Sequence, residues 1–280
     1  MVILVTGATG TIGSQVIKHL AGQGIRVKGA AHSPQKADQL KKAGAEPVPL
    51  DFNNGDSLKS ALKGVDSLFS LTPLAPDMAD NANRLTDAAK AAGVRRIVRL
   101  SAMGSENKAI QLGRWHRAAE LHIESSGIPY TFLQPNNFMQ NFVHMPPING
   151  AYYLPLGSGR ISYVDARDVG AAAAAALTKD GHAGKAYTLT GPAAITVAEV
   201  AAYITKACGK EIRHIDVPEE TARSGMAQMG MPPWLIDALM ELNGIGRAGH
   251  KSAVTGDVRL LTGKEPTPFE HFARDCAASI

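Results

Sequence analysis

The sequence predicts an α/β fold in which a doubly wound parallel sheet carries a small, mainly helical C-terminal lobe. Three observations lead to this fold class. An apolar run at residues 2–5 is followed at once by a glycine-rich turn and a helix pattern. Strand and helix patterns then alternate as far as Pro135, as parallel strands joined by helical crossovers require. Beyond residue 217 helical patterns dominate, which indicates that the late helices form a separate lobe.

The glycine turn reads Gly7-Ala8-Thr9-Gly10-Thr11-Ile12-Gly13. Gly7 permits a sharp turn, Gly10 lets backbone amides approach a phosphate, and Gly13 lets the helix pack closely on the strand. In this strand–turn–helix context the segment predicts a dinucleotide site with the pyrophosphate at the helix N-terminus. A tight turn without a ligand is the alternative. The expected cofactor contacts of the turn are Gly7, Thr9, Gly10, Thr11, Ile12 and Gly13.

The first half of the chain predicts six strands and five helices. The strands are short apolar runs, expected at residues 2–5, 25–31, 46–50, 66–71, 96–101 and 130–134. The helices between them are expected at residues 12–21, 34–43, 56–62, 77–92 and 112–126. Gly93 and Gly127 end the last two helices. Right-handed crossovers would place these helices on both faces of the sheet.

The second half continues less regularly. Short extended pieces are expected around Tyr152 and Ile161, and Asp165 is expected to cap an alanine-rich helix that can lie close against the sheet. Thr196 and Glu199 have the spacing of a capping box at the start of a later helix. The strands expected here are 186–190 and 211–217, and the helices are 196–208, 219–229, 233–242, 254–261 and 268–277.

These elements divide the chain into two expected units. Residues 1–135 and 160–191 would form a dinucleotide-binding domain. Residues 136–159 and 192–280 would form a lobe that covers the cofactor and caps the substrate.

The end of the second strand indicates which dinucleotide would bind. An NAD site usually carries an acid there that bonds the ribose hydroxyls, whereas this chain has His32, Ser33 and Lys36. Ser33 as the N-cap and Pro34 after it mark a new helix N-terminus, which favours a phosphate. The pattern therefore predicts NADP, with NADPH preferred and NAD still accepted. A solvated capping turn is the alternative.

Further cofactor contacts are expected where the other strands end, because ligands of open α/β sheets bind at the carboxyl ends of the strands. Asp51 and Phe52 would meet the adenine. The residues expected beside the nicotinamide half are Leu71, Thr72, Pro73, Ser101, Pro135 and Asn136.

Several segments resemble the NmrA-like branch of atypical short-chain dehydrogenases. They are residues 7–13, 32–36, 116–120, 126–133, 135–141, 262–266 and 269–275, so the resemblance spans nearly the whole chain. The sequence is similar to the compact type 2 NADPH:quinone oxidoreductases and triphenylmethane-dye reductases of this family. The resemblance implies an NADP-binding Rossmann domain and a C-terminal lobe that forms a substrate cleft. The family often has an arginine where this chain has His32.

A proton donor typical of short-chain dehydrogenases is missing from the sequence. Such enzymes use a tyrosine with a lysine four residues later. Tyr203 is followed by Lys206 only three residues later, and no tyrosine of this chain has a lysine at the required spacing. General acid catalysis contributes roughly 10²–10⁴ in rate. We therefore expect acceptors that take a hydride without simultaneous protonation of an unactivated carbonyl, which excludes alcohol oxidation and epimerisation.

His116 and Glu120 lie four residues apart on one predicted helix face. We expect a hydrogen-bonded pair in which His116 orients the substrate or supplies a proton late in the reaction. A surface His–Glu contact is the alternative. No further ligands are spaced for a metal ion, so no metal is expected.

The segment after the sixth strand predicts the substrate contacts. Asn136 and Asn137 can bond a carboxamide or a substrate oxygen, and Asn137 is expected to act in catalysis together with His116. Aromatic and apolar residues nearby would form a wall for a flat acceptor, or would simply form the core of the lobe. The expected wall residues are Met103, Trp115, Phe138, Met139, Phe142 and Tyr152.

The composition excludes several classes of protein. The chain has 280 residues, of which 45% are hydrophobic and 19% charged, as in ordinary globular proteins. Its net charge is only +4 and aromatic residues make up 5%, so no nucleic-acid binding is expected. Cys208 and Cys276 lie far apart, and no segment resembles a signal peptide or a membrane span. We expect a cytoplasmic protein with reduced thiols and no membrane association; a homodimer is compatible with the sequence.

The hypothesis from the sequence is an NADPH-dependent reductase that passes a hydride directly to a flat, conjugated acceptor. Small aromatic or conjugated compounds qualify, such as a quinone, an iminium ion, an azo compound or a cationic dye. The alternative is a non-catalytic NADP-binding redox sensor that acts through protein partners. The missing tyrosine fits both hypotheses.

Overall fold

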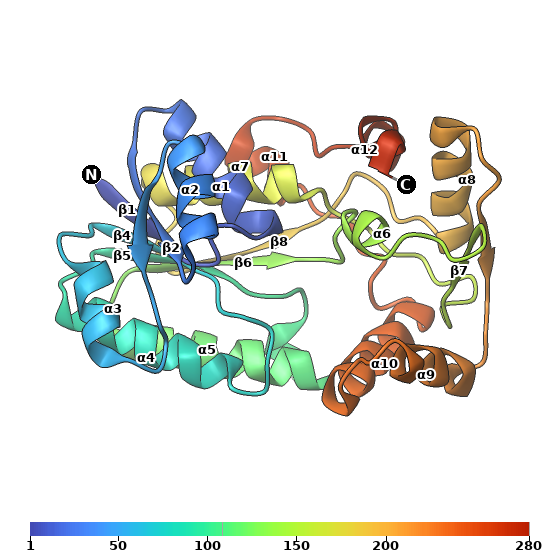
Figure 1. The fold of residues 1–280 in the computed structure, drawn as a ribbon, viewed down its shortest axis with the longest axis horizontal. Coiled ribbons are helices and arrows are strands. Elements are labelled where there is room, and N and C mark those ends of the chain that lie inside the picture. Colours follow the sequence, from blue (N-terminus) through green and yellow to red (C-terminus); the bar gives the residue numbers. More distant parts are fainter. Residues whose placement is uncertain (108, 280) are drawn as a thin grey trace.

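The computed structural model describes residues 1–107 and 109–279 and contains a parallel sheet, helices on both of its faces and a lobe beyond the carboxyl ends of the strands (Figure 1). Seven strands run parallel to their neighbours in the order β3-β2-β1-β4-β5-β6-β8. They are β1 Val2–Val5, β2 Arg26–Ala31, β3 Glu46–Pro49, β4 Ser67–Ser70, β5 Arg96–Leu100, β6 Tyr130–Pro135 and β8 Lys185–Leu189. The order reverses direction after β1, so the predicted doubly wound fold is confirmed.

Each face of the sheet has its own hydrophobic core and its own helices. The helices on one face are α1 Thr11–Gly22, α2 Pro34–Lys42, α7 Ala166–Thr178 and α11 Asp257–Thr262. Those on the other are α3 Gly55–Leu62, α4 Met78–Ala91 and α5 Gln111–Ser126, with a short 3₁₀ helix η1 at Ser105–Asn107. Figure 1 shows the two layers above and below the sheet.

Helix α1 packs very closely on the turn that precedes it and on α7. A Cβ atom at Gly13 would lie 2.2 Å from the carbonyl oxygen of Gly7, and one at Gly170 would lie 2.5 Å from the Cβ atom of Gln15. Only glycine fits at either position, because real Cβ atoms do not approach other heavy atoms so closely. The alanines of α7 other than Ala171 are buried here, which explains the alanine-rich run.

The lobe has a small parallel sheet and five helices of its own. Its elements are β7 Ala151–Tyr153, β9 Arg213–Ile215, α6 Asn141–His144, α8 Val197–Cys208, α9 Glu219–Gln228, α10 Pro233–Arg247 and α12 Phe269–Cys276, followed by a 3₁₀ turn η2 at Ala277–Ser279. Phe142 is at the centre of its aromatic core: its ring lies 5.2 Å from the rings of Tyr152 and Tyr163 and 5.7 Å from that of Phe269.

The boundary between sheet domain and lobe differs from the expected one. Val258 and Leu261 of α11 belong to the core between α1, α7 and the sheet, so residues 257–262 pack with the sheet domain although they follow most of the lobe. Helix α10 extends to Arg247, beyond the expected end at residue 242. The piece around Ile161 forms only an isolated bridge with Ile195, and α6 was not expected.

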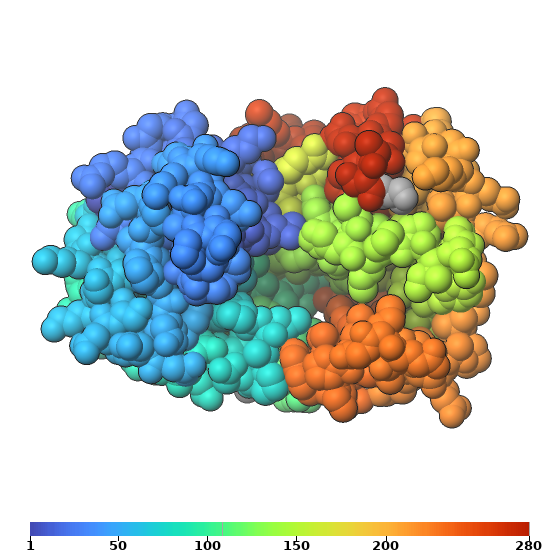
Figure 2. All heavy atoms as spheres, in the orientation of Figure 1, coloured from blue at the N-terminus to red at the C-terminus, as the bar shows by residue number. Residues whose placement is uncertain are grey.

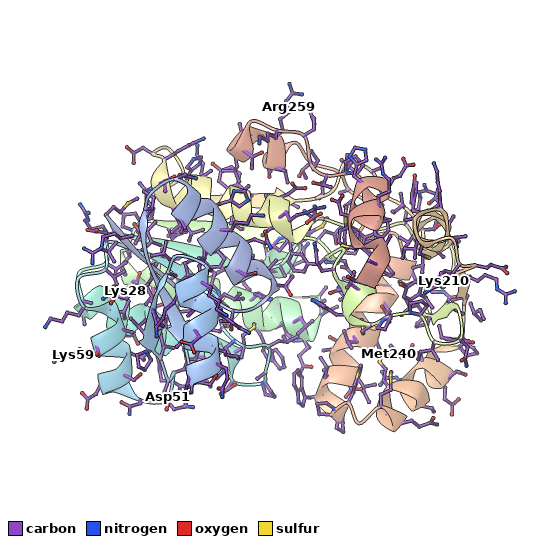
Figure 3. All side chains as sticks on the ribbon, turned by 45° about the horizontal axis from the view of Figure 1, so that its top comes forward. Lys28, Asp51, Lys59, Lys210, Met240 and Arg259 are labelled. Carbon is purple, nitrogen blue, oxygen red and sulfur yellow. The ribbon has the colours of Figure 1, made fainter. Side chains whose placement is uncertain are left out.

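The two parts enclose a hollow on the face shown in Figure 2, between the early helices in blue and teal and the lobe in lime and orange. Asp51 and Met240, labelled in Figure 3, mark the sheet domain and the lobe. None of the described helices combines the length and apolar character needed to cross a bilayer. Within the described ranges, no three His, Cys, Asp or Glu side chains gather as they would around a metal ion.

Candidate functional site

The glycine turn lies between β1 and α1 and leaves the N-terminus of α1 open. Gly10 is the N-cap of α1, and no side chain caps its first amides. Its own amide donates to the carbonyl of Gly7 at 3.0 Å, and a Cβ at Gly10 would meet only that carbonyl oxygen within 4 Å. Backbone amides without a side-chain cap at the positive end of a 12-residue helix can therefore donate hydrogen bonds to a phosphate.

Thr6 attaches this turn to the end of β4. Its hydroxyl donates to the carbonyl of Leu71 at 2.8 Å and accepts from the amide of Leu71 at the same distance. Gly7 follows with φ +61°, and a Cβ there would lie 2.7 Å from the Leu71 side chain. The predicted contacts Gly7 and Leu71 therefore lie side by side at the carboxyl edge of the sheet.

A second subsite lies at the N-terminus of α2. The Ser33 hydroxyl accepts from the amide of Lys36 at 3.3 Å, as expected for an N-cap, and the Lys36 ammonium lies 2.8 Å from Nε2 of His32. His32 and Ser33 border a cavity of about 450 Å³ that Asp51 and Ser57 also line. An imidazole and a helix N-terminus thus border a cavity, with the Lys36 ammonium bonded to that imidazole, an arrangement that suits an adenosine with a 2′-phosphate. Phe52, next to Asp51, is half-buried.

The end of β4 is organised by a buried arginine that was not predicted. Arg99 of β5 is 1% exposed, and its guanidinium donates to the Thr72 hydroxyl at 3.1 Å and to that of Ser70 at 3.3 Å. Its Nε is buried without a partner among the described residues. Burial lowers the pKa of Arg99 to about 10, and the negative charge of Glu120 opposes this effect. Arg99 fixes Thr72, a predicted cofactor contact, at the strand edge.

Glu120 is the second buried charge, and it does not pair with His116 as expected. One carboxylate oxygen accepts from the hydroxyls of Ser101 at 2.6 Å and Ser105 at 3.0 Å, and from the amide of Gln134 at 3.1 Å. The other oxygen accepts from Arg117 at 3.0 Å. The prediction of a His116–Glu120 pair is wrong because these four donors already occupy the carboxylate. Ser101, whose contact with the cofactor stays a prediction, donates its hydroxyl proton to Glu120.

His116 is a neutral imidazole. Its Nδ1 is buried without a hydrogen-bond partner in the described part of the chain. Burial lowers its pKa to about 3, and the positive charges of Arg99 and Lys251 act in the same direction. The low pKa disfavours the charged form near neutral pH, and the role of His116 as a late proton donor stays a prediction. An unpartnered ring nitrogen can still orient a polar ligand.

Asn136 joins the end of β6 to a late loop of the chain. Its Nδ2 donates to the hydroxyl of Ser162 and to the carbonyl of Lys251, both at 2.8 Å, whereas its Oδ1 is buried without a described partner. The ammonium of Lys251 extends to the end of β5 and donates to the carbonyl of Met103 at 3.1 Å. Lys251 is 5% exposed, and its place in the site was not predicted.

The remaining predicted residues divide between cleft and core. Met139, Phe142 and Tyr152 are buried in the core of the lobe, so they form no open wall; the core alternative is the one observed. Met103, Trp115, Asn137 and Phe138 are half-buried, and Pro135 is buried at the end of β6. The Trp115 ring lies 5.9 Å from that of Trp234 in α10, so this contact joins α5 to the lobe.

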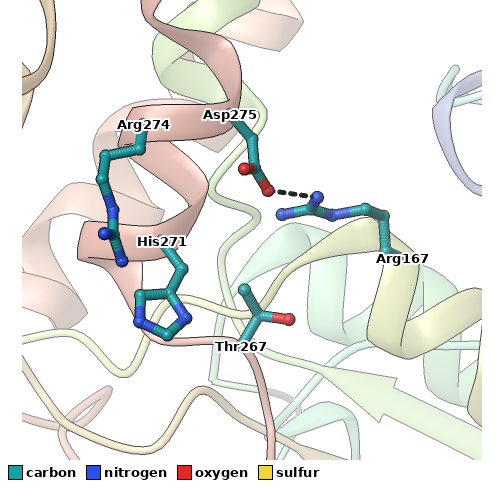
Figure 4. A pocket seen from close by; sticks show the side chains of 5 residues that line it. All are labelled: Arg167, Thr267, His271, Arg274 and Asp275. Atoms are coloured by element: carbon teal, nitrogen blue, oxygen red, sulfur yellow. Dashed lines mark hydrogen bonds and ion pairs between the residues drawn. The ribbon is translucent and has the colours of Figure 1, made fainter.

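A further cavity, of about 390 Å³, lies between the start of α7 and α12 (Figure 4). Its lining includes Arg167, which bonds Asp275 at 2.5 Å and Asp165 at 2.6 Å. Thr267 donates both its amide and its hydroxyl to Asp168. Most of its polar groups are thus paired with protein atoms, and we assign this cavity to the junction between sheet domain and lobe.

Comparison with known proteins connects this geometry to a family. The model of the NmrA-like family matches residues 1–249. The chain is 38% identical to the NAD(P)H azoreductase of Xenophilus azovorans over 282 residues, which cover 99% of both chains.

Two solved structures are similar over nearly their whole length. The NADPH-dependent quinone oxidoreductase of Escherichia coli in complex with NADPH has a TM-score of 0.88 at 28% identity, covering 98% of this chain and 99% of that one. The Citrobacter sp. triphenylmethane reductase in complex with NADP(H) has a TM-score of 0.86 at 28% identity, covering 99% and 100%.

Proposed function

Because the chain belongs to the NmrA-like family, we propose that it is an NADPH-dependent reductase that delivers a hydride to a flat, conjugated acceptor of the azo, quinone, iminium or cationic-dye type. The observation that carries the proposal is a pair of helix N-termini suited to phosphate, one at the open start of α1 and one at the start of α2 beside His32, Ser33 and Lys36. The relatives support it, since the azoreductase and the two solved reductases have names that describe this reaction class.

The residues at the strand ends would hold the nicotinamide half and the acceptor. NADPH, when bound, supplies the hydride from its nicotinamide ring. Thr72, fixed by Arg99, and Asn136, fixed by Ser162 and Lys251, would hold the ring in place. Asn137 and the neutral His116 would orient the acceptor. The chain thereby contributes proximity and exclusion of water, two effects that accelerate a hydride transfer.

The test is NADPH oxidation by the purified protein with an azo dye, a quinone and a cationic triphenylmethane dye. We expect turnover with at least one class, and weaker binding of NADH than of NADPH by calorimetry. Tight NADPH binding without reduction of any acceptor would refute the reductase and favour the redox sensor. Failure to bind either nucleotide would refute both.

A further inference from the structure

Lys251 is a second buried cation of the site beside Arg99, and its backbone is firmly held. The carbonyl of Lys251 accepts from the amide of Ser162 at 3.0 Å, as well as from Asn136. Its ammonium has three N–H donors, but within the described chain only the carbonyl of Met103 is bonded to it. A side chain that is 95% buried thus keeps donors for a ligand.

The surroundings of this ammonium also lack partners. Nδ1 of His116 and Oδ1 of Asn136 are buried and unpaired among the described residues. His116 is close enough for the charge of Lys251 to lower its pKa, and Asn136 contacts the backbone of Lys251. Buried polar atoms are nearly always hydrogen-bonded, so these incompletely bonded groups, each related to Lys251, indicate a polar ligand. Met103 places that ligand at the end of β5, where the reacting half of the cofactor would lie.

The proposed reaction creates a need for a proton with some acceptors only. A hydride adds one hydrogen and two electrons to an azo compound or a quinone, and the second nitrogen or the oxygen is left with a negative charge. A cationic triphenylmethane dye becomes neutral when it receives the hydride and needs no proton.

We propose that Lys251 is the proton donor of this site, an inference that rests on the proposed hydride transfer. An N–H bond of the Lys251 ammonium breaks as the anionic nitrogen or oxygen of the reduced acceptor gains that proton. The neutral amine then regains a proton from water. Lys251 thereby takes the place of the tyrosine that short-chain dehydrogenases use and this sequence lacks.

The charged groups around Lys251 fit this role. Burial lowers its pKa to about 8, while Glu106 of η1 opposes the shift. On α5, His116 is neutral, and on β5, Arg99 stays positively charged near neutral pH. The ammonium is thus present at neutral pH and is more acidic than that of an ordinary lysine. Reduction of azo compounds and quinones should slow as the pH rises through about 8.

The decisive experiment compares Lys251→Met and Lys251→Arg with the wild type on neutral and cationic acceptors. With the azo dye and the quinone, both variants should lose on the order of 10²-fold in kcat, because an arginine keeps the charge but holds its proton. With the cationic dye, which needs no proton, the loss in kcat should be much smaller. NADPH affinity by calorimetry and the thermal transition show whether each variant folds and binds the cofactor.

A second readout does not depend on turnover. In protein labelled with ¹³C at lysine Cε, the signal that Lys251→Arg removes should titrate with a midpoint near pH 8. Equal losses with all acceptors, no loss, a midpoint at the ordinary lysine value, or a wild type that reduces only the cationic dye would each overturn the proton donor. A wild type that reduces no acceptor would instead refute the proposed function.

Discussion

At the scale of single residues, the site depends on two buried charges, Arg99 and Glu120. Each is hydrogen-bonded to its own set of partners, and the two interact through their charges. Arg99 donates to Thr72, and Glu120 accepts from Ser101 just after β5 and from residues on η1, β6 and α5. A buried charge is costly unless it is compensated, and the negative charge of Glu120 helps to keep Arg99 charged. The hydrogen bonds of Arg99 thereby join β5 to the end of β4, and those of Glu120 join the ends of β5 and β6 to α5.

Glu120→Gln should therefore destabilise the fold strongly. The substitution removes the charge that compensates Arg99 and puts an amide group against four donors, so we expect a loss of about 3–5 kcal/mol in the free energy of unfolding. Urea denaturation measures it. The matched control is Glu124→Gln on the same helix, whose carboxylate pairs with Arg117 but is 30% exposed, and which should cost less than about 1 kcal/mol. Similar losses for both variants would contradict the role given to burial.

His116 makes a prediction about the pH dependence of stability. Its pKa in the folded chain is about 3, below the 6.5 of an ordinary histidine, so only the unfolded chain takes up a proton between these values. The free energy of unfolding should therefore fall as the pH falls from about 6.5 towards 3, by at most about 1.4 kcal/mol per pH unit from this residue.

Urea denaturation of His116→Gln at several pH values measures this contribution. The variant should have a flatter pH dependence over that range, whereas His144→Gln, an exposed position in α6, should match the wild type. An unchanged slope for His116→Gln would show that the buried imidazole is not neutral in the folded chain.

The sequence predicted the site residues of local motifs but not those that depend on tertiary placement. The glycine turn and the Ser33 cap are local, and both lie at a helix N-terminus as expected. Lys251 follows no motif, and its partner Met103 is 148 residues away. One feature of the sequence could have indicated Arg99, namely that a charged residue interrupts an apolar strand. His116 and Glu120 lie four residues apart on one helix, as predicted, but the carboxylate of Glu120 accepts hydrogen bonds from donors on other elements.

At the scale of elements, close approach of α1 to its turn decides whether a phosphate can bind. Strong periodic patterns predicted nearly every helix and strand, and the errors have physical causes. Helix α10 was predicted to end at residue 242, five residues before its observed end, because Gly244 and Gly246 have a low intrinsic helix propensity. In the fold, a Cβ at Gly246 would lie 3.0 Å from Leu156, so this glycine lets α10 pack on the lobe.

Gly13→Ala and Gly22→Ala separate close packing from helix propensity within α1. A Cβ at position 13 would collide with the backbone of Gly7, so we expect a loss of about 1–3 kcal/mol in stability together with weakened NADPH binding. At Gly22 nothing lies within 4 Å of a new Cβ, so alanine should add up to about 1 kcal/mol of stability and leave binding unchanged. Calorimetric titration and urea denaturation measure both effects. Unaltered NADPH affinity in Gly13→Ala would place the phosphate elsewhere.

At the scale of the whole molecule, the site lies where the sheet domain and the lobe meet. The chain crosses between the two parts several times, and α11 returns to the sheet after most of the lobe. Hydrogen bonds join the end of β6 to the late loop at this junction, and they involve Asn136, Ser162 and Lys251. A ligand beside Asn136 would therefore touch both parts at once.

From these hydrogen bonds we expect that NADPH stabilises the lobe as well as the sheet domain. Ligand at 100 times its Kd should raise the free energy of unfolding by about 2.7 kcal/mol. Hydrogen exchange should slow at the strand ends and also around residues 250–253, because Lys251 and Ser162 are bonded to Asn136.

Asn136→Ala removes the side chain that joins these segments. In this variant NADPH should still protect the glycine turn, whereas protection of residues 250–253 should disappear. Asn141→Ala, exposed on α6, is the control and should behave as the wild type. If NADPH protects residues 250–253 equally in Asn136→Ala, the coupling runs through other contacts, such as that of Trp115 with Trp234. Loss of all protection would instead make Asn136 a main anchor of the cofactor.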